Sequence, residues 1–69
     1  MKQVTVRSKT QGWTMVEIRG RDTDELTPSM ARAAVEIAFG LSASAVVRDG
    51  RKVYRVTPKT TKKLNAWEF

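Results

Sequence analysis

The residues of this sequence that could do chemistry are mostly basic, and they gather in its last third. Residues 44–69 contain seven basic and two acidic residues, a balance of +5, whereas residues 1–43 hold six and five, a balance of +1. The densest group surrounds one Asp-Gly pair and consists of Arg48, Arg51, Lys52 and Arg55. Because arginine matches phosphate oxygens with two parallel hydrogen bonds, this group predicts a surface that binds nucleic acid. Two alternatives remain open: a solvated edge hairpin that its charges protect from aggregation, and a basic site for an acidic protein.

Further basic residues extend this prediction in both directions along the chain. The end of the sequence contributes Lys59, Lys62 and Lys63. Flexible lysines beside a folded module add salt-dependent affinity for phosphates, although they could equally form a solubilising tail. Near the beginning, Arg7 and Arg19 accompany Trp13 on two predicted strands, and an aromatic ring among arginines can stack a nucleic-acid base.

Four large apolar residues are candidates for a protein interface: Trp13, Met15, Trp67 and Phe69. Tryptophan and methionine are enriched in such interfaces, particularly beside arginine. The structural alternative is that the C-terminal aromatic residues, with Leu64, fold over Trp13 and cover it. The sequence leaves base stacking, a protein interface and internal packing all open for Trp13.

The composition gives little reason to expect catalysis, a metal site or a cofactor site. The chain has no His and no Cys, so the commonest general base and the best nucleophile are missing, and no disulfide can form. Its acidic cluster, formed by Asp22, Asp24 and Glu25, precedes a predicted helix, where it complements the helix dipole. We therefore expect a protein that is not an enzyme and uses no cofactor or metal.

Two strands and a helix are predicted in the first forty residues. Alternation of apolar and polar residues predicts strands over Gln3–Ser8 and Trp13–Arg19, joined by a loop of about four residues that ends at a glycine. The Thr-Pro pair before Ser29 starts a helix that should run from Pro28 to about Phe39, with Gly40 as its stop. The residues expected to face the core are Val4, Val6, Val16 and Ile18 of the strands and a broad helical face of Met30, Ala31, Ala34, Val35, Ile37, Ala38 and Leu41.

A second hairpin should follow, with strands Ser44–Arg48 and Lys52–Val56 on either side of the Asp-Gly turn. A two-residue turn would pair Arg48 with Arg51 and place both on one face with Arg55, although a one-residue bulge would change this register. The expected core face of the hairpin consists of Ala45, Val47, Tyr54 and Val56. After it, residues 60–67 could form one or two helical turns or a loose arm.

These elements predict one small α+β domain over residues 1–58, with the order ββαββ and two antiparallel hairpins packed on one amphipathic helix. Residues 59–69 are expected to form a basic C-terminal tail, as a short helix or an arm. The sequence starts with no apolar leader, and its apolar runs are too short to span a bilayer, so we expect a cytoplasmic protein without a membrane partner. Self-association into a homodimer is one way for so small a core to gain stability.

The segment Val47–Tyr54, a basic turn between two short strands, resembles the wing of phage excisionase and MerR-like winged-helix proteins. The rest of the chain departs from that family, because it predicts one helix where a helix-turn-helix needs two. The resemblance therefore carries over no fold and no binding residue.

From the residues we expect a small basic protein that binds DNA or RNA through the 44–56 hairpin and the tail, of the kind that serves as a phage or plasmid accessory or regulatory factor. The alternative is an inhibitor or adaptor that docks on an acidic host protein through Trp13, Met15 and the C-terminal aromatic residues.

Overall fold

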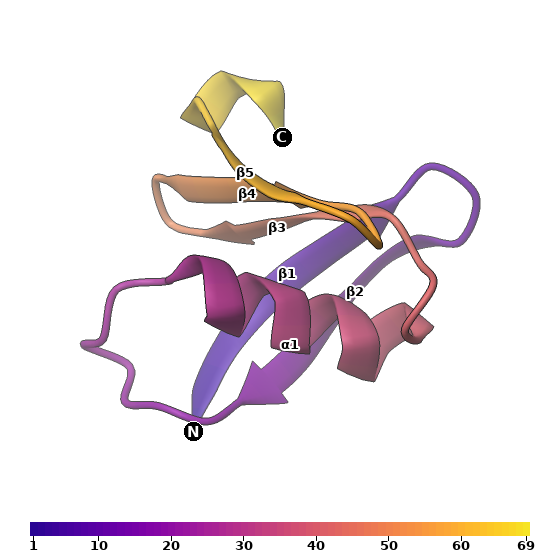
Figure 1. Ribbon diagram of the computed structural model, residues 1–69. Coiled ribbons are helices and arrows are strands. Elements are labelled where there is room, and N and C mark those ends of the chain that lie inside the picture. Colours follow the sequence, from indigo (N-terminus) through magenta and orange to yellow (C-terminus); the bar gives the residue numbers. More distant parts are fainter.

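Five strands and one α-helix make up the computed structural model, which describes all residues from 1 to 69. Their bounds are β1 Lys2–Ser8, β2 Gly12–Ile18, α1 Pro28–Phe39, β3 Ala45–Asp49, β4 Lys52–Val56 and β5 Thr61–Leu64, followed by a short 3-10 helix, η1, Ala66–Glu68. The strands form one antiparallel sheet in the order β2-β1-β3-β4-β5. Helix α1 lies on one side of this sheet and η1 on the other (Figure 1). The α+β class is confirmed, but the order is ββαβββ rather than ββαββ.

The first hairpin forms as its alternating sequence predicts. Val4 pairs with Val16, and three loop residues separate the closing pair of Ser8 and Gly12. The buried Ser8 hydroxyl accepts hydrogen bonds from the amides of Thr10 (3.2 Å) and Gln11 (3.3 Å), which stabilises the loop. Gly12 has a φ of 77°, a conformation that glycine adopts without steric cost.

Local signals set both ends of α1. The Thr27 hydroxyl accepts a hydrogen bond from the amide of Met30 at 3.2 Å, and Pro28 occupies the first helical turn, where its missing N–H costs nothing. The helix ends at Gly40, whose φ is 101°. The predicted start, stop and cap of the helix are therefore confirmed.

The buried stripe of α1 lies within the expected apolar face but is narrower than that face. It is centred on Ala31, Ala34 and Val35, whose small side chains allow the helix to lie close to the sheet. Ile37 and Leu41, which we expected in the core, are mostly exposed. Met30, Ala38 and Phe39 are only partly buried against the core, so the helix faces the sheet with a narrower stripe than its apolar residues suggest.

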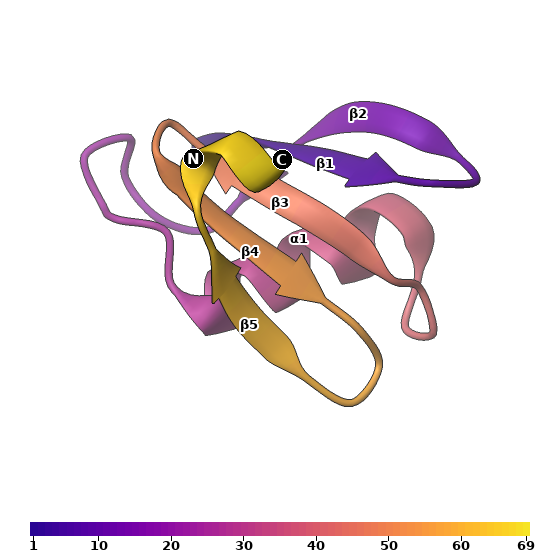
Figure 2. The same ribbon diagram turned by 90° about the horizontal axis from the view of Figure 1, so that it is seen from above.

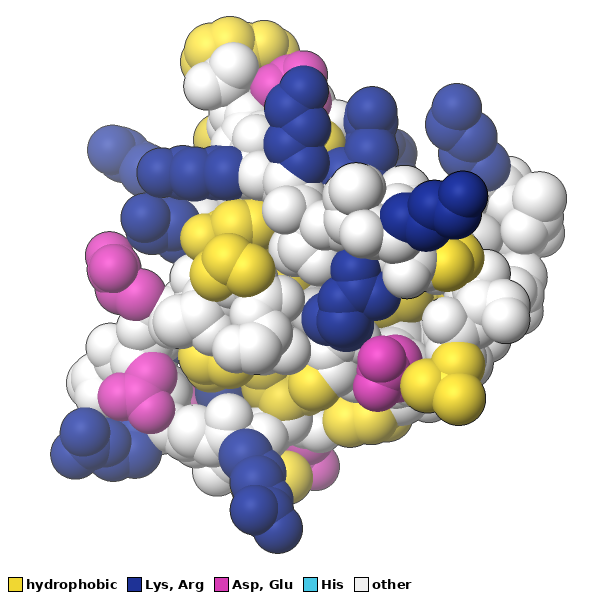
Figure 3. Space-filling model, in the orientation of Figure 1, with side chains coloured by type: hydrophobic (Ala, Val, Ile, Leu, Met, Phe, Trp, Pro, Cys, Tyr) yellow, Lys and Arg dark blue, Asp and Glu magenta, His cyan; other side chains and the backbone are white.

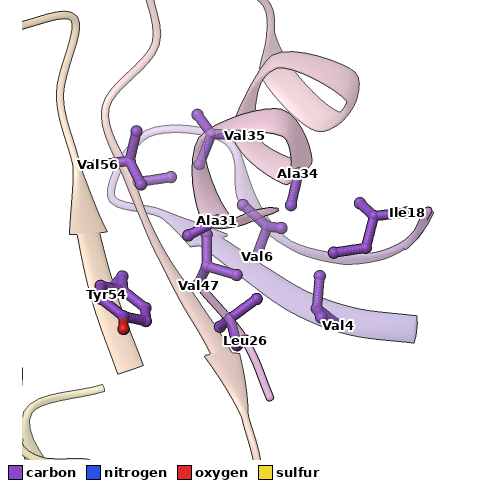
Figure 4. Close-up of a cluster of buried hydrophobic side chains, with 11 residues drawn as sticks. Val4, Val6, Ile18, Leu26, Ala31, Ala34, Val35, Val47, Tyr54 and Val56 are labelled. Atoms are coloured by element: carbon purple, nitrogen blue, oxygen red, sulfur yellow. The ribbon is translucent and has the colours of Figure 1, made fainter. Parts of the chain in front are cut away.

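The core lies between α1 and the helix-facing side of the sheet (Figure 4). Valines from three strands point into it, together with Tyr54 and with Leu26 from the β2–α1 connection. Leu26 was not predicted as a core residue, since it lies in a charged connection without periodicity. Its side chain is 2% exposed and closes the core beside the start of the helix.

The second hairpin has a different register from the predicted one. Asp49 pairs with Lys52, so that the two-residue turn is Gly50-Arg51 rather than Asp49-Gly50. Gly50 has a φ of 61°, and no other residue type has a positive φ, which fits a type II′ turn with glycine in its first central position. The pairing of Arg48 with Arg51 is therefore wrong. The expected faces are retained, however, because the register has moved by two residues and the side-chain period is two.

The tail adds a fifth strand to the sheet, which the sequence did not predict. Residues 61–64 pair with β4 instead of forming helical turns. The Arg32 guanidinium ties this strand to the helix, since it donates hydrogen bonds to the Thr57 carbonyl oxygen (2.9 Å) and to the Thr61 hydroxyl (3.0 Å). Leu64 is buried beside its partner Val53, and η1 contacts β4 above them.

Neither the length nor the apolar content of α1 is sufficient for a transmembrane helix, and it is the only α-helix of the chain.

Candidate nucleic-acid interface

We call the side of the sheet opposite α1 the open face. Side chains on this face form rows across the five strands, and each strand contributes one side chain to a row. The register of the sheet defines one such row, which consists of Trp13, Arg7, Val46, Arg55 and Lys62 in the order β2-β1-β3-β4-β5. The next row consists of Met15, Thr5, Arg48, Val53 and Leu64. Strand β1 and the β3–β4 hairpin, which are distant in the sequence, thus bring Arg7, Arg48 and Arg55 to one surface. Figure 2 shows β1, β3 and β4 side by side in the sheet.

Spacing within the first row follows from sheet geometry. Neighbouring strands lie about 4.8 Å apart, so the backbones at Arg7 and Arg55, separated by Val46, lie roughly 10 Å apart. Lys62 extends the row by one further strand. All three cationic side chains are exposed, so a negatively charged chain lying across the strands would meet a cation at three of five positions.

None of the four open-face cations (Arg7, Arg48, Arg55 and Lys62) forms a salt bridge within the protein. The chain has two salt bridges, and both lie elsewhere: Lys2 Nζ is 2.6 Å from Asp49, and Arg21 Nε is 3.5 Å from Asp24. In Figure 3 most Lys and Arg side chains lie in the upper part of the molecule, where Figure 1 shows the sheet and the C-terminal end of the chain. The open face therefore keeps its positive charge available to a partner.

Two acidic side chains, Glu17 and Glu68, lie near this face, and neither forms a salt bridge with its cations. Glu17 is opposite Gln3, toward the far end of β1 and β2. Glu68 is in η1, where its Oε2 atom accepts a hydrogen bond of 2.8 Å from the Asn65 amide. This bond closes a capping box and commits the carboxylate to holding the 3-10 turn in place.

Phe69 organises two of the arginines. The Cζ atoms of Arg7 and Arg48 lie 4.9 Å and 5.5 Å from the centroid of its ring. Cation–π contacts at such distances are worth about 0.5–1 kcal/mol at exposed sites. The half-buried ring therefore restrains both guanidinium groups on the open face without neutralising their charge.

Of the three alternatives left open for Trp13, the structure does not show the one in which C-terminal aromatic residues cover it. Trp13 is 67% exposed and its neighbour Met15 is 54% exposed, because Phe69 lies over the arginines instead. Trp67 is 82% exposed. The cross-strand partner of Trp13 is Arg7, so an exposed indole stands at the end of the row of cations.

The other predicted basic residues do not join the open face. Lys52 and Lys63 have the same strand parity as Tyr54 and so belong to the helix side. Arg19 follows the end of β2 and lines a shallow depression against α1. Arg51 is in the β3–β4 turn and Lys59 is in the β4–β5 loop, at opposite ends of the sheet.

Sequence reasoning missed one feature, a depression of about 550 Å³ at the end of the open face. Three connections meet there: the β1–β2 loop, the residues before β3, and the end of β4. The pairing of β1 with β3 creates this meeting point. Since that pairing is non-local, no spacing in the sequence could have indicated the depression.

Comparison of the chain with family models, with curated proteins and with solved structures finds no match. A function for the chain is therefore inferred from the geometry of the open face.

Proposed function

We propose that the protein binds nucleic acid with the open face of its sheet. The observation that carries the proposal is the presence of four exposed cations without a salt bridge, Arg7, Arg48, Arg55 and Lys62, on one surface. The Arg48 Nε atom donates a hydrogen bond of 3.2 Å to the Gly50 carbonyl oxygen, which leaves its charge uncompensated. Guanidinium groups bind phosphate oxygens with directed, charge-assisted hydrogen bonds. Their restraint by Phe69 lowers the entropy that two of them lose when a phosphate binds.

The sheet topology favours a single strand over the groove of a duplex. A two-stranded ribbon can enter the major groove, but here β3 and β4 are central strands with β1 and β5 paired on their outer sides. A broad surface with an exposed aromatic residue instead resembles the platforms on which unpaired bases stack. Trp13, next to Arg7, is the residue that would stack a base.

The test is the salt dependence of binding to a single-stranded oligonucleotide, measured by fluorescence anisotropy. Neutralisation of four phosphates gives a slope of log affinity against log salt of about −3, since each phosphate of a single strand contributes roughly −0.7. The triple variant R7A/R48A/R55A should bind far more weakly, and its slope should fall to about −1.

The control is R19A/R21A/K63A, which removes the same charge from exposed residues away from the open face. It should retain nearly the whole slope of the wild type. Equal losses in the two triple variants, or a flat salt response of the wild-type protein, would refute the proposal.

A second candidate function rests on a different observation, the exposure of Trp13 (67%) beside Met15 (54%). An apolar pair bordered by arginines is also suited to anchor an acidic protein partner. Under that function the apolar pair supplies most of the affinity, and oligonucleotides compete weakly or not at all. The anisotropy experiment separates the two candidates, because this second function predicts weak oligonucleotide binding by the wild-type protein as well.

A further inference from the structure

The depression at the end of the open face has the composition of an anion site. Arg7 and Lys9 enter it from β1 and its loop, and Arg55 enters it from β4. None of the twelve residues that line it is acidic. No acidic side chain from the surrounding elements therefore compensates its positive charge. Figure 2 shows these elements: the end of β1, the start of β3 and the end of β4.

Several hydrogen-bond donors in the depression have no partner within the protein. The hydroxyls of Ser42 and Ser44 and the side-chain amide of Gln11 line it, and none of these three side chains forms a hydrogen bond; only the backbone amide of Gln11 does, to Ser8. By contrast, the hydroxyls of Ser8 and Thr57 are committed to their own loops. The free donors are exposed and near the cations, so they are available to a bound anion.

The size and position of the depression restrict the kind of anion. A volume of about 550 Å³ is larger than a phosphate group needs and falls within the range of pockets that hold small organic ligands. Arg7 and Arg55 also belong to the row that crosses the open face. A nucleic-acid strand on that row therefore reaches the depression where it leaves the sheet.

We propose, on the basis of the nucleic-acid function above, that this depression binds the terminal phosphate monoester of a nucleic-acid strand. A monoester carries a charge of about −1.5 to −2 near pH 7 and presents three acceptor oxygens, more than an internal diester offers. Three cations and the two free serine hydroxyls match this demand. The protein then recognises the end of a strand as well as its backbone.

The test uses oligonucleotides of one sequence that carry a 5′-phosphate, a 3′-phosphate or hydroxyl groups at both ends, together with a free nucleoside monophosphate. Wild-type protein should bind one of the phosphorylated strands about tenfold more tightly than the hydroxyl-ended strand, because charge-assisted hydrogen bonds are the strong ones. The variant S42A/S44A should lose most of this preference and keep its affinity for the hydroxyl-ended strand. The control T23A/S29A, which removes two hydroxyls outside the depression, should keep the preference.

A pH series adds a readout specific to the monoester. Its second pKa is about 6, so the preference should shrink as the pH falls from about 7.5 to 5.5. The charged groups that face the anion are Arg7, Lys9 and Arg55, and neither a carboxylate nor a histidine lines the depression.

The outcomes separate the two proposals. Equal binding of the phosphorylated and hydroxyl-ended strands overturns the terminal-phosphate site and leaves the nucleic-acid function standing. A free monophosphate that binds as tightly as the phosphorylated strand overturns the strand end as the ligand. Failure of every oligonucleotide to bind overturns the nucleic-acid function and this inference with it.

Discussion

Lys62 and Lys63 show at the scale of single residues why the position of a charge on the sheet decides its role. They are neighbours in β5 and both are exposed, yet Lys62 pairs with Arg55 on the open face and Lys63 pairs with Tyr54 on the helix side. Charge and flexibility are the same for both. Only the alternation of side chains along the strand separates them.

This pair provides a matched test. Lys62→Ala should weaken binding of a single-stranded oligonucleotide roughly two- to fivefold and reduce the salt slope by about 0.7, because one phosphate contact is lost. Lys63→Ala should leave both quantities nearly unchanged. Titration of the two variants by fluorescence anisotropy checks the prediction. A larger loss of affinity in Lys63→Ala than in Lys62→Ala would place the interface on the helix side of the sheet and contradict the proposal.

Lys2 illustrates the opposite case, a cation that is part of the structure. It is buried, its Nζ atom lies 2.6 Å from Asp49, and it also donates a hydrogen bond of 3.2 Å to the Asp22 carbonyl oxygen. The net charge of +6 therefore includes a residue that no ligand can reach. Asp49, which we predicted in a turn, lies at the end of β3 and forms the salt bridge with this buried cation.

At the scale of the elements, local signals determined what could be predicted. The Thr27-Pro28 start and the Gly40 stop fix the helix from adjacent residues, and the alternation of β1 and β2 fixes their hairpin. The polar, lysine-rich strand β5 carries no such signal. It is a strand because β4 offers an edge to pair with and because Arg32 anchors it from the helix.

The candidate site was predictable to the same extent. Arg48 and Arg55 were correctly expected on one face, since their separation within the hairpin gives them the same parity. Arg7 joins them only through the pairing of β1 with β3, which is set by packing across the whole core. The role of Phe69 could not be predicted either, because it depends on the path of the chain after β5.

Leu64 tests the contribution of β5 and η1 as elements. It is 8% exposed and packs beside Val53, so Leu64→Ala should lower the free energy of unfolding by about 2–3 kcal/mol. The control Leu41→Ala removes the same side chain at a site that is 77% exposed and should change it by less than about 0.5 kcal/mol. Urea denaturation followed by tryptophan fluorescence measures both, and similar losses would show that β5 does not contribute to the cooperative core.

At the scale of the whole molecule, the fold separates two tasks between the two sides of one sheet. The helix side holds nearly all of the buried apolar residues, whereas the open side holds arginines that form no salt bridge and the exposed indole of Trp13. Figure 1 shows α1 and the C-terminal end on opposite sides of the strands. A single helix is sufficient to cover one face of this small sheet, and on the other face η1 covers only the part beside Val53 and Leu64.

The most direct test follows the side-chain NMR signals of the seven arginines and two tryptophans while a single-stranded oligonucleotide is added at fixed salt. We predict that the Nε–Hε signals of Arg7, Arg48 and Arg55 and the indole signal of Trp13 shift with one common affinity. The signals of Arg19, Arg21, Arg32 and Trp67 should stay in place. Shifts confined to this second group, or no shift in any arginine, would contradict a nucleic-acid interface on the open face.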